Sequence, residues 1–574
     1  MNRRVLLLIV VPLLVLACCA TGVAVGVLAF APLRERVMAM LGLRQQTLAA
    51  ELIPADAVFY MSLSYNLQAQ PGYETIRKAY LDNPKIKRAL QDAKENLKKE
   101  SKIDWDAEVA SWLGSEIGLA VLSLSPEDLK GDAPPLVLLV ASRDLNASNR
   151  FLERLRERAA EEGSPFEERT YGQTRYWFRP TEPGTEEPPI LLATVRDFVV
   201  MATQEKALQA VVDRADGKGE SLSRSPRFQR VMEELPKQAV LLGYMDFPSM
   251  LEAYRKTLSQ TPGAPSFEEM LGAGPSGQIL QAMKVGGFSG ELLSEGIRVQ
   301  YVTIIQREEL SPEAQEMLDA PAISERMLAR VPEDVLFVFQ TPQIGKAIRQ
   351  TLNAMRANPD VERQLEDMQS ALGIDLEEDL LSWMTGDLAF MLHRVSTPAI
   401  PELPVGFSAL IETDRPEEAR AGLERLERLL QISGLTVEEM EISGRPLRVL
   451  IDPSGTQVAA YAVGPEAVGI GFPPEALAKA HPERSPERAI QGNPRFQQVL
   501  RHLPGRRSGL VFVDTQGLWD LIGDRIPPSQ REGFEQDVRP FLEPIKGIGS
   551  ANEASPGSTV QRGVFFIYIV PESQ

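Results

Sequence analysis

Two aspartates, Asp246 and Asp514, stand where buried strands are expected to end. A carboxylate in such a place can serve as a general acid or base, but that chemistry usually needs a second titrating group within reach. Neither aspartate has a His, Cys or Lys at a spacing that marks a catalytic motif. Hydrolysis by these carboxylates is therefore a hypothesis, and the sequence assigns no catalytic residue.

Two arginines and two tryptophans also recur in similar surroundings. Arg227 and Arg495 each lie within Pro-Arg-Phe, where a guanidinium could clamp a carboxylate or phosphate, or form a local ion pair. Trp112 and Trp383 each follow a serine, where an indole could stack on a ligand or fill the core. For both pairs we favour the structural explanation, and all four residues remain candidates for a site.

Metal and cofactor sites are not indicated. The two cysteines, Cys18 and Cys19, lie in an N-terminal apolar stretch, so the rest of the chain has neither a disulfide nor a thiolate site. The three histidines are His393, His481 and His502, and none forms the i, i+4 pair of a helical zinc site. We therefore predict no cofactor and no metal.

Composition and charge limit which classes of protein and partner are possible. The chain has 574 residues, more than one hydrophobic core usually supports, so two or more domains are expected. Its 43% hydrophobic and 24% charged residues are typical of a globular protein. The net charge of −18 repels phosphate backbones, which argues against nucleic acid as a partner.

The N-terminal segment predicts attachment to a membrane. From Val5 to Leu33 the chain carries no charge, and a spanning helix needs about 20 apolar residues. Arg3 and Arg4 precede this run, and positive charge on the short side favours a cytoplasmic N-terminus. We therefore predict that residues 1–36 form one transmembrane helix, that the protein is a single-pass protein of the cell membrane, and that its body is extracytoplasmic.

A lipid anchor is the alternative to this helix. Val15-Leu16-Ala17-Cys18 resembles the signal of a bacterial lipoprotein, which makes Cys18 a possible lipidation site. The apolar run continues after Thr21, whereas mature lipoproteins usually turn polar there. A cleaved signal peptide fits less well, because its apolar core is only about 7–15 residues long. The helix and the lipid both leave the body tethered to a membrane surface.

Several sequence blocks occur twice in the same order, which predicts an internal duplication. The matching blocks are 53–59 with 331–337, 111–113 with 382–384, 225–229 with 493–497, and 244–246 with 512–514. The recurring positions are mainly apolar residues, prolines and helix caps. A duplicated fold explains them better than a duplicated activity.

Each copy is predicted to contain both helices and strands. Apolar runs such as 57–63 predict buried strands. Asp104 and Asp375 are placed as helix N-caps, and Glu378 completes a capping box in the second copy. Strands that follow one another with little helix between them predict antiparallel sheets.

The predicted fold class is therefore α+β. We expect two tandem homologous domains with mainly antiparallel sheets and packed helices, plus the N-terminal transmembrane helix. The predicted bounds are 50–305 for the first domain, 306–329 for a helical linker and 330–571 for the second domain.

Two motifs of the first copy carry a resemblance to a known family. Pro-Ala-Asp-Ala-x-Phe spans 54–59, and Ser-Trp-Leu-Gly spans 111–114. With these motifs the chain resembles a family of bacterial proteins, common in cyanobacteria and related phyla, that is known only as a domain of unknown function. The resemblance covers nearly the whole body and implies an N-terminally anchored, extracytoplasmic protein. The second copy departs from the opening motif at Glu333 and Val335, and the family has no catalytic residues to carry over.

Three functions remain open at this stage. The favoured hypothesis is a non-enzymatic binding or scaffold module at the cell envelope, whose partner would be an envelope protein or a lipid. The alternatives are an envelope hydrolase that uses Asp246 and Asp514, and a carrier of a lipid or other apolar ligand.

Overall fold

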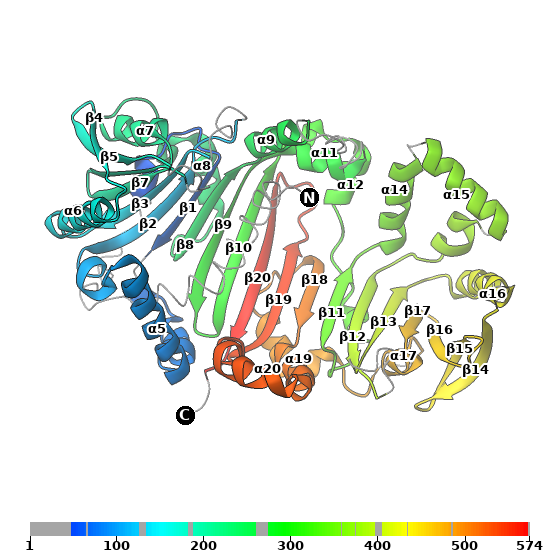
Figure 1. The fold of residues 1–574 in the computed structure, drawn as a ribbon. Coiled ribbons are helices and arrows are strands. Elements are labelled where there is room, and N and C mark those ends of the chain that lie inside the picture. Colours follow the sequence, from blue (N-terminus) through cyan, green and yellow to red (C-terminus); the bar gives the residue numbers. More distant parts are fainter. Residues whose placement is uncertain are drawn as a thin grey trace.

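The computed structural model describes most of the chain (Figure 1). It describes residues 48–64, 67–125, 134–181, 188–259, 274–356, 359–373, 375–396, 404–432, 434–483 and 486–571. The predicted anchor, residues 1–36, and the possible lipidation site Cys18 lie outside these ranges. Within these ranges no helix is long and apolar enough to cross a membrane. The predicted fold class included a transmembrane helix, and the described residues contain none.

All strands of the described residues belong to one antiparallel sheet of 20 strands. The first half contributes β1 (Phe59–Ser64), β2 (Leu113–Val121), β3 (Leu136–Ser142), β4 (Glu167–Tyr171), β5 (Thr174–Arg179), β6 (Ile190–Val195), β7 (Phe198–Ala202), β8 (Leu241–Asp246), β9 (Met283–Leu293) and β10 (Gly296–Ile305). The second half contributes β11 (Phe337–Thr341), β12 (Leu388–Arg394), β13 (Val405–Glu412), β14 (Thr436–Ile442), β15 (Arg445–Ile451), β16 (Gln457–Val463), β17 (Ala467–Phe472), β18 (Arg507–Val513), β19 (Ile545–Glu553) and β20 (Val560–Ile569).

The strand order follows from the pairings between neighbours. It is β4-β5-β6-β7-β3-β2-β1-β8-β9-β10-β20-β19-β18-β11-β12-β13-β17-β16-β15-β14. Each half connects its ten strands in the same order, so a position in one half has an equivalent in the other. That equivalence provides matched control sites within one chain.

The predicted fold class, with two tandem domains and mainly antiparallel sheets, is wrong because the described strands form one continuous sheet. The closing strand of the first half, β10, pairs with the closing strand of the second half, β20, so the sheet continues through the middle of the molecule. Tyr301 on β10 also donates a hydrogen bond to Asn552 on β19 (2.6 Å). A closing strand has a free edge whose N–H and C=O groups need partners. Each half supplies that partner for the other.

One face of the sheet is covered by helices, and we call it the closed face. The helices are α7 (Glu205–Ala215), α8 (Pro226–Glu234), α17 (Pro474–Lys479) and α18 (Pro494–Leu500). Under them lie two hydrophobic cores, one in each half, with fully buried aromatic residues such as Tyr60 and Phe512.

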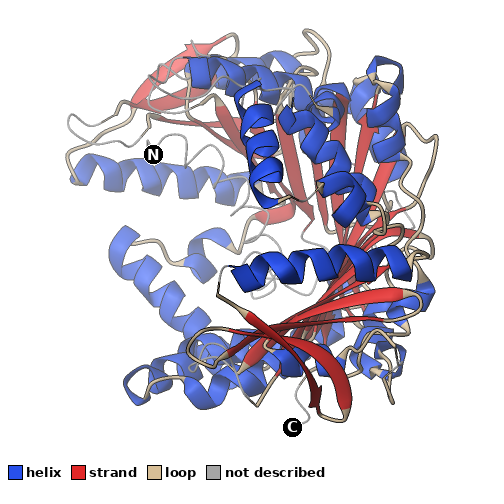
Figure 2. Ribbon diagram, turned by 90° about the vertical axis from the view of Figure 1, so that its right-hand side faces the viewer, coloured by secondary structure: helices blue, strands red, loops and turns tan. Residues whose placement is uncertain are grey.

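The opposite face is covered only in part, and we call it the open face. Helices α6 (Leu145–Glu161) and α16 (Pro416–Ile432) pack on its outer strands, and α5 (Pro84–Ser101), α9 (Phe247–Ser259), α19 (Thr515–Ile522) and α21 (Arg539–Leu542) lie near strand ends. Figure 2 shows the twist of the sheet and helices on both sides of it. The remaining α-helices are α4 (Tyr73–Ile76), α11 (Pro275–Ala282), α12 (Pro312–Leu318), α13 (Glu325–Leu328), α14 (Ile344–Arg356), α15 (Pro359–Leu372) and α20 (Pro528–Gly533).

The helix caps occur where the sequence places them, with one correction. The Asp104 and Asp375 carboxylates accept backbone N–H bonds at the starts of two short π-helices, η5 (Trp105–Val109) and η8 (Leu376–Leu381). The backbone N–H of Asp375 donates a hydrogen bond to the Asp379 carboxylate (2.9 Å). The predicted acceptor was Glu378. A π turn is wider than an α turn, so the residue four positions after the cap reaches back to it.

Candidate functional site

The predicted candidate Asp246 is engaged in structural contacts at the end of β8. Its Oδ2 accepts a charged hydrogen bond from Arg227 Nη1 at the start of α8 (2.8 Å). Its Oδ1 accepts the backbone N–H of Ser249 in the first turn of α9 (3.1 Å). The carboxylate therefore ties a strand end to two helices and has no oxygen without a partner.

The second half repeats this arrangement. Arg495 Nη2 lies 2.6 Å from Asp514 Oδ2, and Asp514 Oδ1 accepts the N–H of Gly517 in α19 (3.0 Å). Four strands separate β8 from β18, a distance of about 24 Å at the usual strand spacing. The antiparallel alternation also puts the two aspartates at opposite ends of the sheet. Even glycosidases, whose two carboxylates can lie far apart, need only about 5–9.5 Å between the groups, so the structure does not bring these candidates together.

The two candidate tryptophans fill equivalent core positions. Trp112 and Trp383 are 3% and 1% exposed, and each donates its indole N–H to a carbonyl of the preceding π-helix, Glu108 (2.7 Å) or Asp379 (3.2 Å). With their rings enclosed by core side chains, neither has a face on which a ligand could stack.

A pair of buried carboxylates was missed by the sequence reasoning. Glu116 on β2 is 7% exposed and accepts hydrogen bonds from the Ala49 N–H (3.2 Å) and the Tyr60 hydroxyl (3.2 Å). Burial raises the pKa of Glu116 to about 7, and nearby Glu51 raises it further. The signal available in the sequence was an acidic residue four positions after a tryptophan, at the start of an apolar strand.

The equivalent carboxylate in the second half is Asp387. It accepts hydrogen bonds from the Ser324 N–H (2.5 Å) and from Gln340 Nε2 (2.8 Å), and burial raises its pKa. In both halves the carboxylate thus holds the segment that precedes the first strand against the sheet. The contacts of both carboxylates therefore indicate a structural role.

We expect Glu116→Gln to flatten the dependence of stability on pH. Because the folded protein keeps a proton on Glu116 that the unfolded chain releases, the free energy of unfolding falls as pH rises from 4.5 to about 7. The loss from this one group is about 3 kcal/mol. Urea unfolding at pH 5 and pH 8 measures it, with Glu153→Gln, at an exposed glutamate of α6, as the control. Equal pH slopes in wild type and Glu116→Gln would contradict the expectation.

A group of exposed and partly exposed apolar side chains lies on the open face of the second half, and we call it the aromatic strip. It consists of Phe337 and Phe339 on β11, Phe390 on β12, Phe407 on β13, and Ile470 and Phe472 on β17. Phe339 stands opposite Phe390, and Phe407 stands opposite Phe472. The rings of Phe390 and Phe407 stack with centroids 5.8 Å apart. The strip is therefore continuous over four neighbouring strands.

The exposure of the strip is unusual for such large side chains. Phe407, Ile470 and Phe472 are 39%, 41% and 42% exposed. Contiguous exposed apolar residues mark places where another molecule binds. Sequence reasoning missed them because an apolar run on both faces of a strand looks like a strand buried on both sides.

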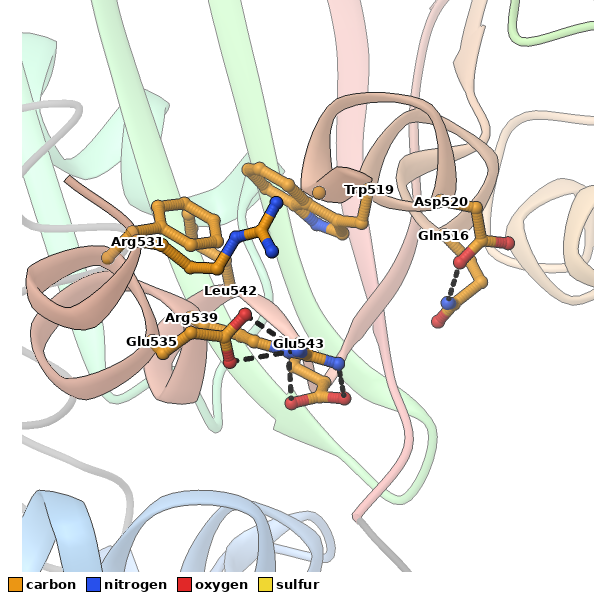
Figure 3. A pocket seen from close by; sticks show the side chains of 10 residues that line it. Gln516, Trp519, Asp520, Arg531, Glu535, Arg539, Leu542 and Glu543 are labelled. Atoms are coloured by element: carbon orange, nitrogen blue, oxygen red, sulfur yellow. Dashed lines mark hydrogen bonds and ion pairs between the residues drawn. The ribbon is translucent and has the colours of Figure 1, made fainter. Parts of the chain in front are cut away.

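A small cavity of about 270 Å³ lies between α19, α20 and α21 (Figure 3). Trp519 and Phe534 line it together with Arg539, whose guanidinium is held by Glu535 (2.8 Å) and Glu543 (3.1 Å). Glu535 and Glu543 are thus engaged by a neighbouring cation, which does not suit them for proton transfer, and Asp520 accepts a hydrogen bond from the Gln516 amide (2.9 Å). In the described part of the chain no cluster of His, Cys, Asp and Glu could hold a metal ion.

Comparison with known proteins adds a family but no activity. A family model described as "Protein of unknown function (DUF3352)" matches residues 13–568. No curated protein matches the chain. Crystal forms III and I of TP0453 are similar at 9% identity and a TM-score of 0.25, over 47% and 49% of this chain and 84% and 90% of theirs. A TM-score this low does not establish a shared fold.

Proposed function

Since the chain belongs to the DUF3352 family of proteins of unknown function, no activity comes with its family, and we propose that it is a non-enzymatic module that binds an apolar ligand at the cell envelope. The observation that carries the proposal is the open face, where large apolar side chains are exposed in a contiguous group. Envelope location is part of the proposal and is motivated by the uncharged run from Val5 to Leu33.

The contacts of the aspartates argue for binding rather than hydrolysis. Asp246 and Asp514 each give one oxygen to an arginine and the other to a helix N-terminus. A general base has to approach the proton that it abstracts, and these carboxylates are buried and occupied. The two aspartates that motivated the hydrolase alternative are therefore not free to act as its general base.

Burial of the open face by a ligand supplies the driving force. Apolar surface removed from water contributes about 25 cal/mol per Å². A chain tethered to a membrane surface meets lipids before other apolar molecules, so we favour the lipid carrier over a protein scaffold.

The test is photo-crosslinking of the full chain in bacterial membranes with a diazirine-bearing fatty acid, followed by peptide mapping. We expect labelled peptides from the open-face strands as well as from the N-terminal segment. The double substitution Asp246→Asn and Asp514→Asn should leave this labelling unchanged. Labelling confined to residues 1–47 would sink the proposal, and a substrate whose turnover depends on the two aspartates would restore the hydrolase.

A further inference from the structure

We propose that the aromatic strip, together with Arg394 at its end, binds one hydrocarbon chain that carries an anionic head group, as a fatty acid or a phospholipid does. This inference rests on the proposed function and narrows it to one place and one class of ligand. The shared chemistry is a long alkyl chain ending in a carboxylate or a phosphate.

The strip lies between two covered parts of the same face. On one side Leu392 packs with Leu518 and near Leu521 of α19. On the other side Trp383 and α16 cover Ile411 and Val468. The uncovered rings are therefore the floor of a band bounded by helices, and a ligand lying on them would contact apolar surface beneath it.

The chemistry of this floor selects a hydrocarbon. On β11, β12, β13 and β17 the alternate residues that share the open face with the strip are apolar, except Thr341 and Arg394. A bound peptide would have to leave N–H and C=O groups without partners on such a surface, at a cost of roughly 1–3 kcal/mol each. An alkyl chain has no such groups, so it gains from burial without that cost.

Arg394 supplies the polar end of the site. Alternation along β12 puts its side chain on the same face as Phe390 and Leu392. It is exposed, donates to the Gly517 carbonyl (3.3 Å), and has no ion pair with another described residue. A guanidinium binds carboxylate and phosphate oxygens well, and it stands out on a chain whose net charge is −18.

The length of chain before the sheet keeps the body within reach of a bilayer. Residues 34–47 join the uncharged run, which ends at Leu33, to Leu48. Fourteen residues span at most about 50 Å, comparable to the thickness of a whole bilayer. The body of a chain tethered through residues 5–33 would remain next to the lipids that it is proposed to bind.

Labelling of strip variants tests the inference in the full chain. Phe407→Gln combined with Phe472→Gln should lower labelling of the β11–β13 and β17 peptides about tenfold or more, because two rings on which the ligand lies are lost. The matched control is Met201→Gln, since Met201 on β7 occupies the position in the first half that Ile470 has in the second. This control should leave second-half labelling unchanged.

The head group is tested separately with Arg394→Gln. We expect it to lower labelling by the diazirine fatty acid several-fold and to leave labelling by the matching fatty alcohol unchanged. A phosphatidylglycerol probe with the same alkyl label separates the two sources, because stronger labelling by one of them identifies the bound class. Equal effects on acid and alcohol would overturn the role of Arg394.

The outcomes separate this inference from the proposed function. Open-face labelling that the double Phe variant does not reduce overturns the strip as the site and leaves the proposed function standing. No open-face labelling in wild type overturns both. A double variant that changes the oligomeric state of the full chain but not its labelling makes the strip a contact between copies and overturns the inference. Circular dichroism melting checks folding, and Phe472→Gln alone replaces the double variant if that protein unfolds.

Discussion

Replacing Trp383 by alanine is expected to lower the free energy of unfolding by about 3–5 kcal/mol. The indole is 1% exposed and lies in a core with Ile411, Leu423 and Val468. Its N–H bond to the Asp379 carbonyl would also be lost. Little collapse into the cavity is expected, because Gly422 already brings α16 into close contact with the Asp379 backbone.

Urea denaturation of the full chain, followed by circular dichroism, measures this effect. Trp383→Phe should lose less, because it keeps most of the apolar volume. Trp112→Ala, at the equivalent position of the first half, should lose a similar amount. Because the sheet is continuous, we expect one transition in every variant. A separate early transition that involves only half of the signal would mean that the halves unfold independently.

Replacing Arg495 by methionine is expected to lower the free energy of unfolding by about 2–3 kcal/mol. This loss is smaller than the usual one for a broken buried ion pair, because Arg495 is partly exposed. The Asp514 side chain is only 4% exposed, whereas that of Arg495 is 36% exposed. Arg495→Met therefore leaves a buried carboxylate with no cation beside it. Loss of stability comes mainly from that uncompensated charge.

A double-mutant cycle with Asp514→Asn separates the charge from the other contacts. Asparagine keeps the cap on the Gly517 N–H and removes the charge, so the double variant should recover part of the stability that Arg495→Met loses. Arg420→Ala, which breaks an exposed pair with Glu417, is the matched control and should change stability by less than about 0.5 kcal/mol. A double variant no more stable than Arg495→Met would argue against the charge as the cause.

Local features of the fold could be predicted from the sequence because local interactions determine them. Asp104 and Asp375 are caps because each stands before a helical segment. Asp246 and Asp514 end strands as expected, but only the structure shows that each is held by an arginine 19 positions earlier. The capping box at Glu378 failed because the sequence does not distinguish a π turn from an α turn.

Long-range pairing could not be predicted in the same way. The apolar alternation of β10 and β20 fits a strand at the edge of a domain as well as a strand in the middle of a sheet, and only the partner decides. The aromatic strip was missed for a related reason. Phe339 and Phe407 have the same residue type as buried neighbours such as Phe512, and their exposure depends on which helices cover the face.

The join between β10 and β20 has a consequence for biogenesis. The edge of β10 pairs with β20, the last in chain order of the described strands. While the chain is made, the first half must keep that edge unpaired until β20 has emerged. Pairing over such a long sequence separation is slow, and an unpaired strand edge is prone to aggregate. Assembly of this protein should therefore depend on a holdase that shields one strand edge.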